Sequence, residues 1–278
     1  MIFDSVVNTL EPEVYEAVEE LFKHCIKKEQ NPNEFLIYLV NGHYDPIQLE
    51  GYSPYMIGLG EGIKDMDRLR FLEVYLSLDF EKYYNEATER HRKFELRTES
   101  LSLEMMIYVH FWESKVILRR YNQLALLADS NEYDWHLSPR PKETYDFFVK
   151  DIRDVFQRNN LKIYSILKRA YRSQIRNAFA HSDYYFSDEK IYLENYDPSN
   201  RWTVEYISFS DFEEMLVLTV LLHHCTVDLT EKYSKIYGHE NPSRLINVPD
   251  ANPKPSKRIE YQETGDHYDW YWDSQLRH

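Results

Sequence analysis

The chain has 278 residues, of which 43% are hydrophobic and 29% are charged, which is typical of a globular protein and argues against a disordered chain. Its formal net charge of −14 disfavours binding of nucleic acid over the whole surface, and its 7 glycines are too few to favour a nucleotide fold built on glycine-rich loops. The two cysteines, Cys25 and Cys225, provide neither a disulfide framework nor zinc-ligand spacing.

The first 95 residues are expected to form an N-terminal helical region. Apolar residues from Val14 to Cys25 recur about every 3.6 residues, which predicts a helix over residues 13–28. Residues 43–62 contain several prolines and glycines and are predicted to be a loop. Asp65 can cap the next helix, which extends to about residue 84, and the charged stretch 86–99 indicates a boundary.

Residues 96–235 are expected to form a separate helical domain. Its helices are predicted over residues 101–128, 141–156, 161–181 and 210–232. Pro141 suits the first position of the second of these helices. The residues Ser210 and Glu213 form a capping box at the start of the fourth, which is apolar enough to be buried in a core. We therefore predict a mainly α fold.

Two groups of short strands interrupt this helical pattern. The aromatic and β-branched segments 184–186, 190–193 and 202–207 predict a small β-hairpin or meander inserted in the helical domain. Residues 236–278 are predicted to be a tail rich in proline, asparagine and charge. It is expected to end in a hairpin of residues 258–262 and 267–272 around Thr264-Gly265-Asp266.

Neither a signal peptide nor a membrane span is expected. The first residues, Met1-Ile2-Phe3-Asp4, lack a basic segment followed by an apolar one. The longest apolar run, 215–222, is interrupted by Thr219 and is too short to cross a bilayer. These features favour an intracellular, cytoplasmic protein with no membrane partner.

Residues 158–181 stand out because they contain six basic side chains and no acidic one, which leaves the rest of the chain at −20. On a continuous helix, the apolar residues Tyr164, Leu167, Tyr171, Ile175 and Ala178 would form the core side. On that helix Ser173, Asn177 and His181 would share one column, beside a column of Arg172 and Arg176. This pattern predicts a local site for a polyanion on an otherwise acidic body.

Arg176 and His181 do not converge on a single ideal helix. Residues five apart are separated by about 140° at 3.6 residues per turn. A second copy of the helix, or a relaxed last turn, would be needed to close a site between them.

The segment Arg176-Asn177-Ala178-Phe179-Ala180-His181 resembles the Arg-x4-6-His motif of the HEPN superfamily. The resemblance extends to the helices expected around this segment and covers about half of the chain. Residues 1–95 and 236–278 lie outside it. It implies a HEPN-like helical bundle with the β-hairpin as an insertion and residues 1–95 as an N-terminal helical extension. Members usually pair as homodimers, and many are metal-independent endoribonucleases of toxin, antiphage or RNA-processing systems, so for this chain the resemblance implies RNA cleavage in stress or phage defence.

The resemblance also implies roles for individual residues. His181 would be the general acid or base, Arg176 would stabilise the charged phosphorane, and Asn177 would orient the phosphate or the imidazole; these chemistries suit the side chains. No cofactor or metal would be needed, and the partners would be RNA, a second copy and a cognate antitoxin or regulatory protein. Residues expected to contact RNA are Arg172, Arg169, Lys168 and Ser173. Supporting roles are assigned to Asp183, Glu113 and Tyr184.

Several alternatives stay open. His181 could be an ordinary helix-end histidine favoured by the helix dipole, and Arg176 an ordinary surface arginine. A family member of this fold could be a non-catalytic RNA-binding or protein-interaction module, and an unrelated enzyme on a helical scaffold is a third class. Some family members carry a modifiable tyrosine two residues after the histidine, where this chain has Asp183.

Overall fold

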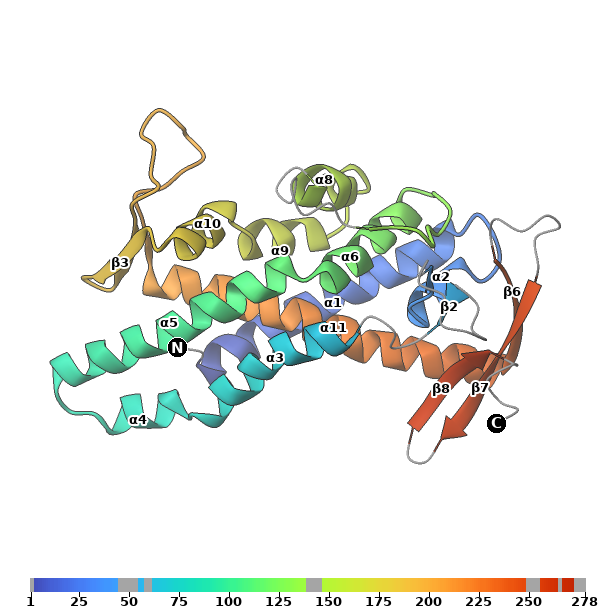
Figure 1. Cartoon of the computed structure of the whole chain (residues 1–278), viewed down its shortest axis with the longest axis horizontal. Coiled ribbons are helices and arrows are strands. Elements are labelled where there is room, and N and C mark those ends of the chain that lie inside the picture. The colour runs from blue at the N-terminus through green and yellow to red at the C-terminus, as the bar shows by residue number, and fades with distance from the viewer. Residues whose placement is uncertain are drawn as a thin grey trace.

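Helices make up most of the chain in the computed structural model, which describes residues 3–44, 55–57, 62–138, 147–248, 256–264 and 267–272 (Figure 1). This confirms the mainly α class. The helices are α1 (Asp4–Lys28), α2 (Glu34–Leu39), α3 (Gly62–Ser77), α4 (Phe80–Glu86), α5 (Arg90–Glu113), α6 (Lys115–Ala128), the π-helix η2 (Phe147–Arg153), α8 (Asp154–Arg158), α9 (Ile163–Ala170), α10 (Ser173–His181) and α11 (Phe209–Glu240). The predicted helix start at Pro141 lies outside the described residues.

The helix α11 forms the centre of the fold, with α1 lying along it (Figure 1). Leu216, Leu218 and Leu229 of α11 are fully buried, as expected for the most apolar helix of the chain. The apolar stripe predicted for α1 is confirmed, since every residue of that helix that is buried belongs to it or continues it toward Leu10. The first helix is therefore a core element of the protein and not an appendage to the helices that follow it.

One hydrophobic cluster joins the three predicted regions. It contains Val14 from the N-terminal region, Leu216 from the central one and Trp270 from the tail. In addition, the expected boundary between residues 95 and 96 lies inside the continuous helix α5. The helical regions are therefore packed together around a shared core.

Several predicted helices are shorter or shifted. The predicted helix 101–128 is divided at Ser114, whose side chain accepts a hydrogen bond from the Ile117 backbone nitrogen at 3.2 Å and so caps α6. Asp65 lies inside α3 and does not cap it, and α3 and α4 are separated at Asp79, which has a left-handed backbone (φ 48°). The cap of α11 is Ser208, not Ser210.

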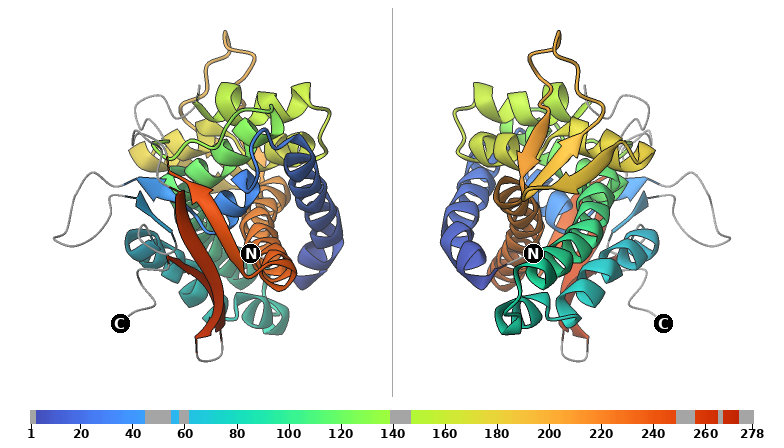
Figure 2. Two further views of the ribbon diagram at one scale, coloured as in Figure 1. Left: turned by 90° about the vertical axis from the view of Figure 1, so that its right-hand side faces the viewer. Right: turned by 90° about the vertical axis from the view of Figure 1, so that its left-hand side faces the viewer.

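The short strands form separate antiparallel sheets. The predicted meander is confirmed as the sheet β3 (Tyr184–Ser187), β4 (Lys190–Leu193) and β5 (Tyr206–Ser208), although β5 is shorter than the predicted strand. The C-terminal hairpin is confirmed as β7 (Ser256–Thr264) and β8 (His267–Trp272), and β6 (Ser243–Asn247) adds a third strand to it; Gly265 and Asp266 lie outside the described residues. In the predicted loop 43–62, β1 (His43–Tyr44) pairs with β2 (Tyr55–Met56). The two larger sheets lie at opposite ends of the long axis (Figures 1 and 2).

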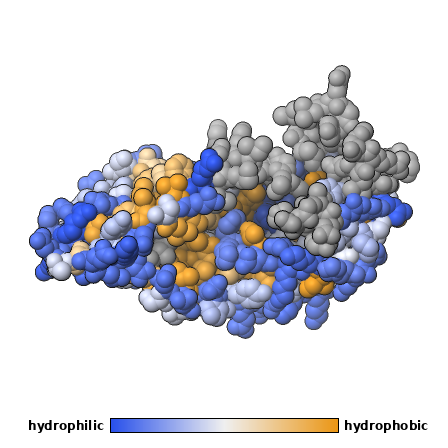
Figure 3. Space-filling model, turned by 90° about the horizontal axis from the view of Figure 1, so that it is seen from below, coloured by the Kyte–Doolittle hydropathy of each residue, from blue (hydrophilic) through white to orange (hydrophobic). Residues whose placement is uncertain are grey.

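Exposed apolar side chains gather on α3, on α4 and in the turn between them. Phe71, Val74, Leu76, Leu78 and Tyr83 are each more than two-fifths exposed. Figure 3 shows apolar surface on the face of the molecule that carries these two helices. Among the described residues, no helix combines the length and the apolar character that crossing a bilayer requires.

Candidate functional site

The segment that carries the Arg-x4-His motif is a helix of its own. The predicted helix 161–181 is interrupted at Tyr171 and Arg172, which have extended backbones, so α9 ends at Ala170 and α10 begins at Ser173. Tyr171 is buried there against Phe148, with ring centroids 4.2 Å apart. The direction of α10 is therefore set by tertiary packing and not by continuation of α9.

The hydroxyl of Tyr108 bridges this interruption. It donates a hydrogen bond to the carbonyl oxygen of Ala170 at 3.1 Å and accepts one from the backbone nitrogen of Arg172 at 2.8 Å. Tyr108 comes from α5 and is fully buried, and burial raises the pKa of its phenol far above the usual value. A neutral hydroxyl that both donates and accepts thus fixes the start of the motif helix. Tyr108 has no local sequence signal that would have identified this role.

The other end of α10 is closed by a left-handed residue. Ser182 has φ 59°, and the Asp183 backbone nitrogen donates to the carbonyl oxygen of Ala178 at 2.8 Å. The helix is therefore regular up to His181, and the last turn is not relaxed.

The motif side chains lie on the outside of α10. Asn177 and His181 are exposed and Arg176 is half-buried, while Ile175 and Ala178 are fully buried. The guanidinium of Arg176 donates to the side-chain oxygen of Asn177 at 3.2 Å. Neither Arg176 nor His181 forms an ion pair with any residue that the structure describes. Both groups are thus available to an external anion.

Within one chain, the helix does not bring Arg176 and His181 together. Asn177 and His181 are four apart on the α-helix and share one side, whereas Arg176 and His181 lie about 140° apart. Arg172 precedes the helix, so the predicted column of Arg172 and Arg176 is not part of α10. A site that uses both motif residues on one phosphate needs groups from a second surface.

The basic side chains of residues 158–181 divide into two groups. Arg158, Lys162 and Arg169 form ion pairs with acids of other segments; the Arg169 guanidinium lies 2.8 Å from Glu13 of α1 and 2.9 Å from Glu214 of α11. Lys168 is exposed and its ammonium lies 6.0 Å from the centroid of the Tyr164 ring. Half of the basic cluster therefore holds helices together.

Arg172 is placed differently from Arg169. It is half-buried and borders a cavity of about 280 Å³ between the start of α10, strand β5 and the first turns of α11. Ser173, also half-buried, is the first residue of α10. Both of these predicted RNA contacts therefore lie at the opposite end of α10 from His181.

The sheet β3–β4–β5 is fixed to the motif helix by Gln174. Its side chain donates to the carbonyl oxygen of Val204 at 2.8 Å and to Asn195 at 3.2 Å, and accepts from the Val204 backbone nitrogen at 2.9 Å. Asn195 in turn donates to the backbone oxygen of Gln174 at 3.0 Å. Gln174 is buried, so these bonds are shielded from water and hold the sheet and α10 in one orientation.

The predicted supporting residues are only partly near the motif. Tyr184 stacks on Phe179 of α10 with ring centroids 6.0 Å apart, and burial raises the pKa of its phenol. Asp183 is half-buried directly after the helix end. Glu113 is exposed at the C-terminal end of α5. Helix α5 runs in the direction opposite to that of α10 (Figure 1), and Tyr108, five residues before Glu113, already contacts the start of α10. Glu113 is thus carried away from His181.

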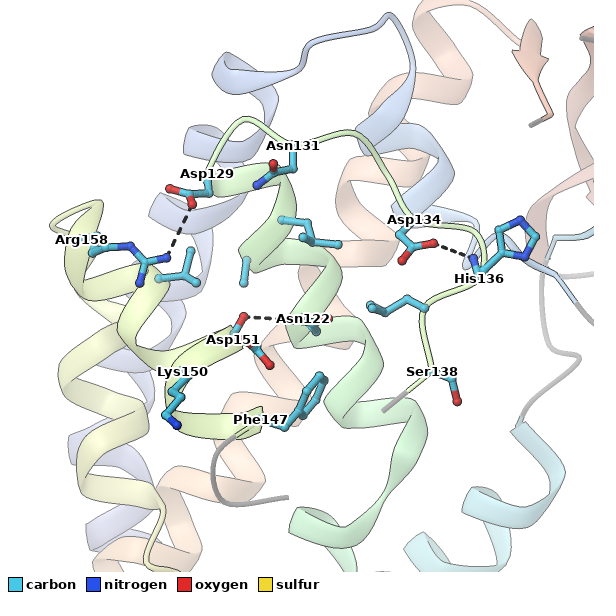
Figure 4. Close-up of a pocket in the computed structure, with 14 residues that line it drawn as sticks. Asn122, Asp129, Asn131, Asp134, His136, Ser138, Phe147, Lys150, Asp151 and Arg158 are labelled. Carbon is cyan, nitrogen blue, oxygen red and sulfur yellow. Dashed lines mark hydrogen bonds and ion pairs between the residues drawn. The ribbon is translucent and has the colours of Figure 1, made fainter. Parts of the chain in front are cut away.

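A second concave site lies between α6, η2, α8 and the loop after α6 (Figure 4). It has a volume of about 600 Å³ and a mixed polar lining that includes Asn122, Asp134, Lys150 and Asp151. Asn122 donates to the backbone oxygen of Asp151 at 2.9 Å, close to where the π-helix changes to the α-helix. Its mixture of both charges singles out no ligand class. Among the described residues, no group of three or more His, Cys, Asp or Glu side chains could hold a metal ion.

No family model, no curated protein and no solved structure matches this chain.

Proposed function

We propose that the chain is a metal-independent endoribonuclease of the HEPN type that acts as a homodimer. The observation that carries the proposal is the outer side of α10, where the imidazole of His181 and the guanidinium of Arg176 form no ion pair with any described residue, while the opposite side of the helix is buried. A half-buried guanidinium and an exposed imidazole on a rigid helix are groups that can promote phosphodiester cleavage.

The proposed reaction uses the ribose 2′-hydroxyl as the nucleophile. His181 accepts the proton of that hydroxyl as its oxygen forms a bond to phosphorus, and the bond from phosphorus to the 5′-oxygen breaks. The leaving oxygen takes up a proton from water, His181 returns its proton to the solvent, and the products carry a 2′,3′-cyclic phosphate and a 5′-hydroxyl. Arg176 stabilises the added negative charge on the phosphorane oxygens, and its hydrogen bond to Asn177 limits the orientation of the guanidinium.

A homodimer would complete this site. Because Arg176 and His181 lie about 140° apart on one helix, two α10 helices facing each other could place Arg176 of one copy beside His181 of the other. Arg172 and Lys168 are retained as candidate RNA contacts. Arg169 is not, because its guanidinium is engaged by Glu13 and Glu214.

The test of catalysis is cleavage of total RNA in EDTA by the wild type and by His181→Ala. We expect only the wild type to cut and to leave cyclic phosphate ends. His224→Ala is the matched control, because His224 is also an exposed helical histidine, paired with Asp228 at 3.3 Å on α11. Cleavage by neither protein, or equally by both, would exclude this nuclease activity of the motif.

The test of the shared site is a mixture of Arg176→Ala and His181→Ala protomers. Each variant alone is expected to be inactive. If Arg176 and His181 act across the interface, a mixed dimer keeps one intact site, and random mixing recovers about a quarter of wild-type activity. If both residues act within one chain, the mixture stays inactive.

A non-catalytic RNA-binding or protein-interaction module is the second candidate. The ion pairs of Arg158, Lys162 and Arg169 favour it, because they leave fewer cations for a polyanionic substrate. Retention of RNA by the wild type without cleavage would support this alternative.

A further inference from the structure

Three tyrosines lie side by side on one face of the β3–β4–β5 sheet. The strand register pairs Tyr185 with Tyr192 and Tyr192 with Tyr206, so all three side chains point to the same side of the sheet. The rings of Tyr185 and Tyr192 are parallel to within 5°, with centroids 4.9 Å apart, and Tyr206 follows at 5.7 Å from Tyr192. We call this set the tyrosine row.

The tyrosine row is on the exposed face of the sheet. Tyr185 is 50% exposed and Tyr206 is 44% exposed, whereas Ile191 and Ile207, which point to the other face, are buried. Within the described part of the chain, β3 is an edge strand and Tyr185 contacts no aromatic ring other than Tyr192. Tyr192 covers one face of the Tyr185 ring, and the half-exposed side chain leaves area on the other face for a planar ligand.

One cation lies against the tyrosine row, and another lies beside an exposed tryptophan in the adjoining loop. The Lys190 ammonium is 3.9 Å from the centroid of the Tyr206 ring, and in the loop that leads to β5 the Arg201 guanidinium is 4.6 Å from the centroid of the highly exposed Trp202 ring. Neither cation forms an ion pair with a residue that the structure describes. These cations lie beside exposed rings, where they can complement the phosphates that follow a stacked base.

The tyrosine row is within reach of the motif helix. Tyr185 follows His181 by four residues, so their Cα atoms are at most about 14 Å apart. The stacking of Tyr184 on Phe179 and the bonds of Gln174 hold the sheet against α10. The row therefore forms a rigid extension of the candidate site.

We propose that the open face of the Tyr185 ring stacks on an unpaired base of single-stranded RNA. Tyr192 packs on the opposite face of the Tyr185 ring and Tyr206 packs next to Tyr192. The inference rests on the proposed function and names its substrate class. Aromatic side chains bind the flat faces of unpaired bases, while the faces of bases in a duplex are covered by their neighbours. This would direct the phosphate next to the stacked base toward the end of α10.

The charges around the row predict how this binding depends on salt. Asp183 precedes β3 and Glu194 follows β4, so acids flank the row at the end opposite Lys190. Few phosphates can be neutralised in such a setting, and affinity should come mainly from stacking. We therefore expect a much weaker dependence on salt than for a protein that makes many phosphate contacts.

The test measures binding of a short single-stranded RNA that carries 2-aminopurine and 2′-O-methyl groups, so that stacking quenches its fluorescence and cleavage is blocked. Tyr185→Val removes the ring but keeps a residue that strands accept, and Tyr185→Phe keeps the aromatic face. We expect Tyr185→Val to weaken binding about tenfold and to abolish quenching, and Tyr185→Phe to behave like the wild type. Tyr83→Val is the control, because Tyr83 is 53% exposed on α4.

Three results would overturn the proposal. Unchanged binding and quenching in Tyr185→Val would exclude stacking on this ring. An equal loss in Tyr185→Phe would assign the contact to the hydroxyl. A change in oligomeric state with unchanged RNA binding would make the row an interface between copies of the chain.

The result is independent of catalysis. If quenching requires Tyr185 but the protein cleaves no RNA, the stacking site is supported and the proposed nuclease activity is excluded. If cleavage requires His181 but neither binding nor quenching requires Tyr185, the nuclease activity is supported and the stacking site is excluded.

Discussion

The hydroxyl of Tyr108 accepts a hydrogen bond from the backbone nitrogen of Arg172 at 2.8 Å and donates another to the carbonyl of Ala170, across the interruption between α9 and α10. Tyr108→Phe removes both bonds and leaves a partly buried donor and a buried acceptor without this partner. We expect the free energy of unfolding to fall by about 1–3 kcal/mol. Urea denaturation measures this, and Tyr83→Phe, an exposed tyrosine, should change stability little. Equal stability of Tyr108→Phe and the wild type would contradict the bridging role.

Gln174 provides a second test of how the motif helix is held. Gln174→Leu keeps an apolar stem but removes the side-chain bonds to Val204 and Asn195. We expect hydrogen exchange to become faster across residues 184–208, because the sheet loses its buried attachment to α10. Gln157→Leu, at an exposed position of α8, should leave the exchange of that segment unchanged. Protection that is identical in both variants would show that Gln174 does not hold the sheet.

Glu213 predicts a pH dependence of stability. The carboxyl is buried, accepts a hydrogen bond from the Phe3 backbone nitrogen and lies 3.5 Å from Arg97, and burial raises its pKa from 4.5 to about 7. The folded state therefore binds a proton more tightly than the unfolded state, so stability falls as pH rises from about 4.5 to 7. Glu213→Gln should flatten this part of the pH profile and raise stability above pH 7. A steeper decline in the variant would contradict the assignment.

The two thiols are expected to be unreactive in the folded protein. Burial raises the pKa of Cys225 to about 12 and that of Cys25 well above its usual 9.0. Because the thiolate is the reactive form, a thiol reagent should modify neither residue under native conditions and both after unfolding in guanidinium. Mass spectrometry measures the modification. Rapid modification of either thiol in the native protein would show that its helix opens locally.

The helical class and the two sheets could be predicted because their patterns are local. The strands on either side of Asp188, for example, follow from aromatic and β-branched residues separated by turn residues. The helix breaks at Ser114 and Tyr171 were not predicted: a single serine fits a helix interior as well as a cap, and Tyr171 continues the apolar period of the expected helix. Tyr171 leaves the helix because its ring packs on Phe148 and because Tyr108, 63 residues earlier in the chain, bonds across the gap.

The candidate site shows the same division. The exposure of Asn177 and His181 could be predicted, because the spacing of the apolar residues Ile175 and Ala178 places the buried side of the helix away from them. The ion pairs of Arg169 with Glu13 and Glu214 could not be predicted, because those acids lie on α1 and α11, which are distant from Arg169 in sequence. The roles of Gln174 and of the pocket beside α6 depend in the same way on segments that only the fold brings together.

The packing of α1 on α11 has a consequence for synthesis of the protein on the ribosome. Phe3 and Glu213 are hydrogen-bonded partners separated by 210 residues, and Val14, Val18 and Leu21 of α1 are fully buried. Helices α6 and α9 also pack on α1, but most of the apolar side of α1 is covered only once α11 has been synthesised. Contacts between such distant segments slow folding and prolong exposure of apolar surface. The nascent chain should thus depend on chaperones until α11 has emerged.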